Sequence, residues 1–119
     1  MNTISSILLV LVAVEHFYFL ILEMFLWTQP KGIKTFGLKS KEFAEDTKVL
    51  AANQGLYNGF LTAGLLFALL EKNIHFATFF LVCVTIAGVY GSYSTKNIRL
   101  FIVQAVPAIL ALIAIVFNN

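Results

Sequence analysis

The sequence predicts an all-α, polytopic membrane protein in which four transmembrane helices form an up-down bundle. Of the 119 residues, 60% are hydrophobic and only 12% are charged, whereas soluble domains are about 45–50% apolar and about 25% charged. Four apolar segments are each close to the ~20 residues that cross a bilayer core. We expect these helices at residues 4–27, 49–70, 74–93 and 98–117, within a single domain of residues 1–119.

The first apolar segment differs from a cleaved secretory signal. A signal peptide has a basic start and a small-residue cleavage site. Here no basic side chain precedes the apolar run, which ends in the bulky residues 24–27. We therefore expect a retained membrane helix. Pro30 and Gly32 are expected to stop it, because proline lacks a backbone donor and glycine favours turns.

The longest connection, residues 28–48, is expected to be a cytoplasmic loop. Its end predicts an early start for the second helix, near Lys41. Ser40 is a candidate N-cap, and Glu42 and Glu45 follow in the first turns, where the helix dipole favours negative charge. This extension fits either a solvated helix end near lipid headgroups or a binding face for a partner.

Basic residues indicate one fixed orientation in the cell membrane. Five lysines lie in residues 28–48, and Lys96 and Arg99 lie between the third and fourth segments, whereas only Lys72 lies at the opposite end. Basic residues prefer the cytoplasmic side. We therefore expect the 28–48 and 94–97 loops to be cytoplasmic and both termini to lie outside. The short links imply antiparallel neighbouring helices.

Three ionisable residues lie in the first apolar segment. With an advance of about 100° per residue, Glu15, His16 and Glu23 fall on one face of the helix. A charge at the bilayer centre costs at least ~2.5–3.5 kcal/mol, so this face is expected to turn into the bundle. A Glu–His pair can be neutral or ionic at a small free-energy difference, which suits proton transfer.

The stretch "NQGLYNGF" of the second segment combines two patterns. Helical geometry places four polar residues on one hydrogen-bonding side; they are Asn53, Gln54, Tyr57 and Asn58. Gly55 and Gly59 fall on the other side as a GxxxG pair, which lets a neighbouring helix approach closely. We expect one face to pack and the other to bind or to satisfy polar groups.

The third and fourth segments add glycines and a proline. Gly88 and Gly91 are expected to allow close packing. Gln104 is the one strongly polar side chain of the fourth segment. Pro107 is expected to kink that helix, because its ring clashes with the carbonyl of Val103.

These patterns together predict a small ligand or proton pocket inside the membrane. Its expected lining is Glu15, His16, Glu23, Asn53, Gln54, Tyr57, Asn58 and Gln104. The alternative is that these residues bond to one another and only lock the helices together. The single cysteine, Cys83, and the single membrane-embedded histidine give no cofactor or metal site.

Four stretches resemble a known family. They are "EHFYFLILEMFLW", "NQGLYNGFL", "AGVYG" and "QAVPA", and together they are similar to the bacterial four-helix integral membrane family known as domain of unknown function number 1304. The resemblance spans nearly the whole chain. It implies a small integral membrane protein and brings no established substrate, cofactor or reaction.

The sequence leaves three functions open. The favoured one is binding or transport of a small solute or lipophilic ligand with proton coupling, in a homo-oligomer because four helices enclose little volume. The alternatives are an intramembrane acid–base enzyme acting on a lipid or isoprenoid and a structural or accessory membrane subunit. The expected partner is the lipid bilayer, and a net charge of +2 gives no argument for nucleic acid.

Overall fold

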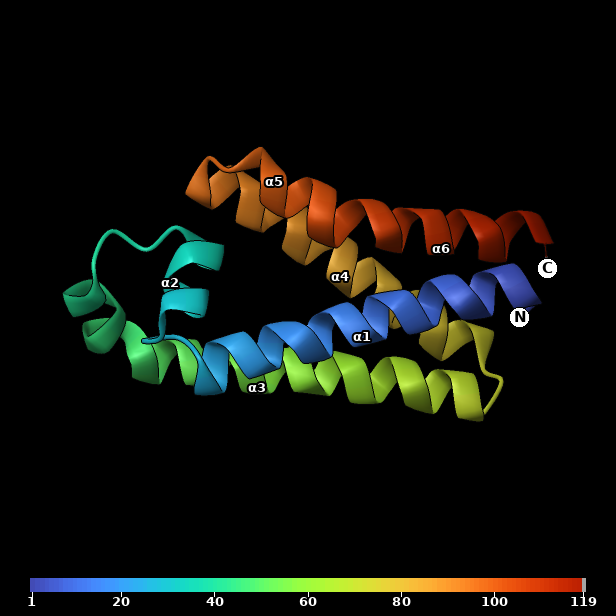
Figure 1. The fold of residues 1–119 in the computed structure, drawn as a ribbon. Coiled ribbons are helices and arrows are strands. Elements are labelled where there is room, and N and C mark those ends of the chain that lie inside the picture. The colour runs from blue at the N-terminus through green and yellow to red at the C-terminus, as the bar shows by residue number, and fades with distance from the viewer. Residues whose placement is uncertain (119) are drawn as a thin grey trace. The chain divides into compact units, whose positions relative to one another are not determined.

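A computed structural model describes residues 1–118, and of Asn118 only the backbone. The prediction of an all-α fold is confirmed (Figure 1). The elements are α1 (Thr3–Phe25), α2 (Pro30–Phe36), α3 (Lys41–Leu70), α4 (Ile74–Thr95), α5 (Ile98–Leu100), the π-helix η1 (Phe101–Ala105) and α6 (Val106–Asn118). The chain divides into two compact units. The first comprises Met1–Val14 and the residues from Leu61 onward, and the second comprises Glu15–Phe60.

Three helical stretches of the described residues are long and apolar enough to cross a membrane. They are Thr3–Phe25, Ile74–Thr95 and Ile98–Phe117, which is compatible with a multi-pass membrane protein. α3 is not among them, so the expected count of four spans is not confirmed. The amides of Asn53, Gln54 and Asn58 lie in the middle of this helix and make it more polar than the other three.

The first unit packs its helices around an apolar core. Leu9 and Val12 of α1, Leu65 of α3, and Leu81 and Val84 of α4 are fully buried in this core. A turn at Glu71–Asn73 reverses the chain between α3 and α4, and the Asn73 side chain caps α4 by accepting a hydrogen bond from the Phe76 N–H. α3 and α4 are therefore antiparallel.

The start of α1 and the end of α6 lie at the same end of the first unit (Figure 1). Lys72 lies there too, because Met1, Ser6, Leu69 and Lys72 line one cavity. Lys72, which was expected at the end opposite to the other basic residues, thus lies next to the start of α1.

The fourth apolar stretch contains an irregularity where the sequence predicts a kink. η1, which ends two residues before Pro107, winds as a π-helix, and the Val106 N–H bonds to the Phe101 carbonyl five residues back. Proline removes one helical donor and crowds the carbonyl of Val103. The wider π-turn accommodates such a break in the α-helical hydrogen-bond pattern.

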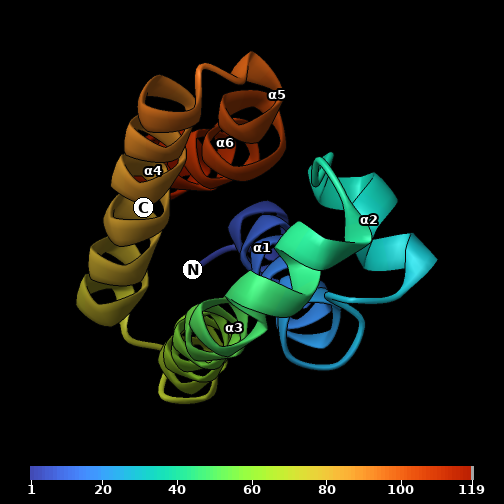
Figure 2. The ribbon, with the colours of Figure 1, turned by 90° about the vertical axis from the view of Figure 1, so that its left-hand side faces the viewer.

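η1 packs closely against α4. Figure 2 shows α4 beside α5 and α6, the elements that precede and follow η1. A Cβ built on Gly88 would lie 2.8 Å from the Cβ of Ala105 and 2.9 Å from its backbone nitrogen. Both residues are buried. The backbone of η1 can approach α4 this closely because position 88 has no side chain.

The second unit corrects the expected end of the first helix. α1 ends at Phe25, and Pro30 begins a new helix, α2, instead of stopping the old one. Proline is favoured at the first helical position, where its missing N–H would be unpaired in any case. Gly32 is buried within α2, and a side chain there would collide with the Leu26 carbonyl. Residues 28–48 thus contain a helix and the start of α3.

The predicted start of α3 is confirmed. Ser40 precedes the helix, and its hydroxyl oxygen accepts a 2.9 Å hydrogen bond from the Phe43 N–H. This is the N-cap arrangement expected from the sequence. α2 ends at Gly37, whose φ of 61° lies in the left-handed region that favours glycine.

The contact between α4 and η1 gives a testable difference between two glycines of the same helix. We expect Gly88→Ala to destabilise the protein by about 1–3 kcal/mol, because the added methyl meets the backbone of η1. Gly91→Ala is the matched control, since its Cβ would meet only Leu100 Cδ1 at an ordinary 3.9 Å. Thermal unfolding in detergent measures both. Equal melting temperatures for the two variants would contradict the close packing at Gly88.

Candidate functional site

The site is centred on a carboxylate that is buried near the end of α1. Glu23 is 7% exposed and Asn58 of α3 is 6% exposed. The Asn58 side-chain amide donates a 2.5 Å hydrogen bond to Glu23 Oε1. A buried polar group without a partner is strongly unfavourable, and bonds to an ionised group are about twice as strong as neutral ones. This bond therefore fixes α1 to α3 at one defined position.

Two glycines of α3 bring the helices within reach of that bond. A Cβ built on Gly55 would lie 2.7 Å from Met24 Cγ and 3.2 Å from the Leu20 carbonyl oxygen, and one built on Gly59 would lie 2.7 Å from Leu20 Cδ1. The close approach expected of this GxxxG pair is therefore made with α1.

The expected division of α3 into a packing face and a polar face is wrong for Asn58. Gly55 packs against α1, and Asn58 bonds to the same helix. Residues three apart on a helix are neighbours on its surface. The glycine side of α3 and the amide of Asn58 thus form one continuous contact with α1.

A cavity of about 310 Å³ opens next to Glu23. Its lining consists of Glu23, Trp27, Leu38, Phe43, Thr47, Leu50, Ala51 and Gln54. Glu23 is the one ionisable side chain in this lining, and Gln54 adds an amide. The remaining lining is mostly apolar or aromatic, so the cavity combines one carboxylate with a hydrophobic wall.

The aromatic wall of the cavity is held in place by hydrogen bonds and ring contacts. Trp27 Nε1 donates a 2.9 Å hydrogen bond to Thr47 Oγ1, and Thr47 donates a 2.7 Å bond to the Phe43 carbonyl. The Trp27 ring also packs on Phe36 of α2, with 5.1 Å between the ring centroids. α2, which the sequence analysis missed, thus supports one side of the cavity.

Glu15 and His16 form a separate pair. His16 is fully buried, and its Nδ1 lies 4.0 Å from Glu15 Oε1, which is too long for a hydrogen bond. The His16 ring meets Phe19 edge to face at 5.3 Å. Glu15 Oε1 is buried and accepts no hydrogen bond from the part of the chain that the structure describes. This oxygen is the one buried side-chain acceptor found unsatisfied in those residues.

The other residues of the predicted pocket do not all face the cavity. Gln54 lines it, but the Asn53 side chain is exposed and donates to the Val49 carbonyl of its own helix at 3.1 Å. Tyr57 is 57% exposed and lies beside Phe60. Gln104 belongs to η1, in the first unit, where it is partly buried.

Trp27, Phe43 and Thr47 line the cavity but were not among the predicted site residues. Trp27 follows Glu23 by four residues, so the expected helix of residues 4–27 would place both on one face, although α1 ends at Phe25 and Trp27 lies in the turn after it. That spacing could have identified Trp27 as part of the site. Thr47 and Phe43 could not be found in the same way, because they reach the cavity through the fold of α2 and the start of α3.

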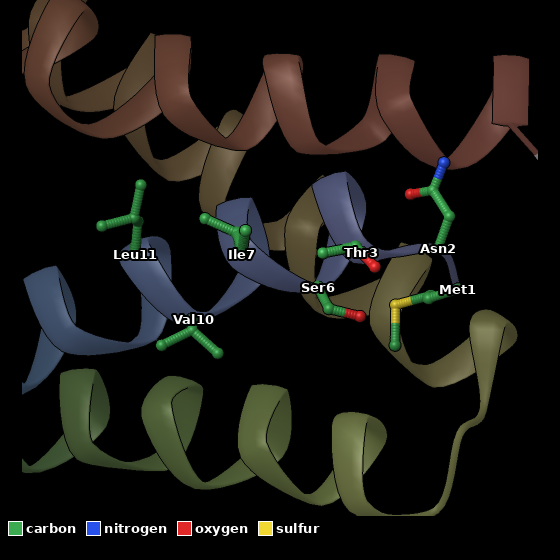
Figure 3. Close-up of a pocket in the computed structure, with 7 residues that line it drawn as sticks. All are labelled: Met1, Asn2, Thr3, Ser6, Ile7, Val10 and Leu11. Atoms are coloured by element: carbon green, nitrogen blue, oxygen red, sulfur yellow. The ribbon is translucent and has the colours of Figure 1, made fainter.

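A larger cavity, of about 430 Å³, follows the first turns of α1 (Figure 3). Its lining is Met1, Asn2, Thr3, Ser6, Ile7, Val10 and Leu11. None of these side chains is acidic or basic, and Asn2 Oδ1 already accepts bonds from the Ser5 N–H and hydroxyl. No group of three or more His, Cys, Asp or Glu side chains in the described chain could hold a metal ion. Of these two cavities, the Glu23 cavity is therefore the one with an ionisable side chain in its lining.

The Glu23–Asn58 bond predicts a specific pattern of stability. We expect Asn58→Leu to cost about 1–3 kcal/mol, because it leaves a buried carboxylate without its donor. Asn53→Leu is the matched control and should change stability little, since that amide is exposed and bonds only to its own helix. Thermal unfolding in detergent provides the measurement.

A double variant separates this bond from general packing. Replacing both partners of a buried hydrogen bond by apolar groups can be nearly neutral. The double variant Glu23→Leu/Asn58→Leu should therefore recover much of the stability that Asn58→Leu alone loses. If Asn58→Leu and Asn53→Leu were equally stable, the bond would have no role in holding α1 to α3.

The comparisons with known proteins identify a family for this chain, and that family has no described function. The family described as "Protein of unknown function (DUF1304)" matches residues 10–116. The uncharacterized protein YpaA of Lactococcus lactis subsp. lactis (strain IL1403) is 32% identical over 120 residues, covering 98% of this chain and 100% of the relative. No solved structure matches. The Glu23–Asn58 contact lies within the matched residues, and the chain belongs to the DUF1304 family.

Proposed function

We propose that this membrane protein binds a small lipophilic cation in the Glu23 cavity and exchanges it for a proton. The observation that carries this proposal is a buried carboxylate that lines an otherwise largely apolar and aromatic cavity. Asn58 bonds to Oε1, so Oε2 is the carboxylate oxygen available to a ligand. Intramembrane acids typically mark substrate, ion or proton pathways.

The lining of the cavity supports a cationic ligand of limited size. No basic side chain is among the lining residues, so Glu23 has no competing cation there. Aromatic ring faces attract organic cations, and Trp27 and Phe43 supply two rings. Ligand sites usually measure roughly 300–1,000 Å³, and the 310 Å³ of this cavity fits a small molecule.

Proton coupling follows from the use of a single carboxylate. The ionised form of Glu23 attracts a cation, whereas the protonated form does not. A proton and the cation therefore compete for the same group. In a membrane protein with access to both sides, such competition supports exchange of one for the other.

We also propose that α3 is the fourth membrane span, with the Lys72 end outside and α2 on the cytoplasmic side. α3 has 30 residues, and at 1.5 Å per residue it is about 45 Å long, more than a bilayer core of about 30 Å. The bond to Glu23 satisfies Asn58 within the membrane. The lysine-rich residues 31–48 support the orientation.

Binding of benzyltrimethylammonium tests the assignment, because this cation carries a permanent charge. We expect Glu23→Gln to weaken binding by at least about tenfold, which equals about 1.4 kcal/mol. The glutamine oxygen can still accept the bond from Asn58, so the helix contact is kept. Glu45→Gln is the control, since Glu45 is exposed and pairs only with Lys48 at 3.1 Å. Isothermal titration calorimetry in detergent measures both.

The pH dependence of that binding tests the coupling to protons. The charge of the ligand does not change with pH, so a protein group must cause any dependence. We expect affinity to fall as the pH is lowered, because protonation removes the negative charge that the cation needs. Glu23→Gln should show no such dependence. Equal affinity of the wild type and Glu23→Gln, or benzyl alcohol binding as tightly as the cation, would contradict the proposal.

A further inference from the structure

α4 carries an apolar groove on one side near its C-terminal end. Thr85, Ile86, Val89, Tyr90 and Tyr93 line this open groove, whose volume is about 390 Å³. Thr85 uses its hydroxyl to bond to the Leu81 carbonyl at 2.8 Å, so its polar group is already satisfied within the helix. The groove is therefore apolar along its length and ends at two tyrosines, of which Tyr90 is 67% and Tyr93 80% exposed.

The turn that follows the groove is basic and has no acidic partner. Lys96 and Arg99 are both exposed, and neither forms an ion pair with a residue that the structure describes. Glu71 is the only acidic residue of the first unit, and it precedes α4 at the other end of that helix. This end of the first unit thus carries an uncompensated positive charge next to an apolar groove.

The backbone N–H groups of Asn97 and Arg99 in this turn are already used. The Asn97 N–H bonds to the Ser92 carbonyl, and the Arg99 N–H bonds to the Asn97 side chain. An anion at the turn would therefore be held by the ammonium and guanidinium groups. Guanidinium groups bind phosphate in a bidentate manner, and tyrosine hydroxyls commonly lie at the level of lipid headgroups.

We propose that this groove and the basic turn after it bind one anionic phospholipid. An acyl chain occupies the groove along α4, and Lys96 and Arg99 hold the phosphate-containing headgroup. A zwitterionic lipid fits less well, because the turn has no acidic side chain to receive the positive choline. The site lies outside the Glu23 cavity and does not depend on its proposed ligand.

Native mass spectrometry of the full chain with dioleoyl phosphatidylglycerol and dioleoyl phosphatidylcholine tests this site. We expect the wild type to retain phosphatidylglycerol in preference to phosphatidylcholine. In the Lys96→Ala/Arg99→Ala variant this preference should be about tenfold smaller. The control is Lys41→Ala/Lys72→Ala, which removes the same net charge elsewhere. An equal loss in both double variants, or no preference in the wild type, would overturn the proposal.

Two further arms separate the lipid from other sources of phosphate and test the groove itself. We expect glycerol 3-phosphate, the soluble headgroup analogue, not to displace phosphatidylglycerol at millimolar concentration; displacement would indicate a site for free phosphates instead. Val89→Trp fills the groove and leaves the charges unchanged, so it should weaken phosphatidylglycerol binding. Unchanged binding would show that the groove does not hold an acyl chain.

Discussion

A carboxylate buried in an apolar helix must find a partner, and this constraint at Glu23 determines the arrangement of the second unit. Its partner is Asn58, and the bond between them requires α3 to approach α1 closely. Gly55 and Gly59 permit that approach because they have no side chains. The glycines and the amide of α3 thus serve one contact, and without Glu23 there would be no reason for a polar residue at position 58.

The same carboxylate connects helix packing with the proposed function. One oxygen accepts the bond from Asn58, and the cavity lies beside the same group. A glutamine at position 23 could also accept that bond through its oxygen, as a neutral hydrogen bond. A glutamate differs from a glutamine because its charge depends on whether the carboxylate is protonated. The aromatic wall formed by Trp27 and Phe43 lies in the same cavity as that charge.

The sequence predicted those features that depend on local patterns. Apolar length predicted α1 and α4, and side-chain capping predicted the start of α3 at Ser40. Asn58, the partner of Glu23, was among the predicted pocket residues. The predicted pocket contained too many residues, because the angular positions of residues on one helix do not show how that helix is rotated relative to its neighbour. α2 was missed because Pro30 fits both the end of one helix and the start of the next.

We propose that contacts with α1 allow α3 to cross the bilayer, although its amides make it less apolar than Thr3–Phe25, Ile74–Thr95 and Ile98–Phe117. Cysteine labelling tests this most directly, with Lys34→Cys and Lys72→Cys placed singly in a Cys83→Ser background and an impermeant maleimide added to intact cells. The account predicts that Lys72→Cys is labelled from outside and that Lys34→Cys is labelled only after permeabilisation. Labelling of both positions from the same side would contradict it, because residues 34 and 72 would then lie on one side of the membrane.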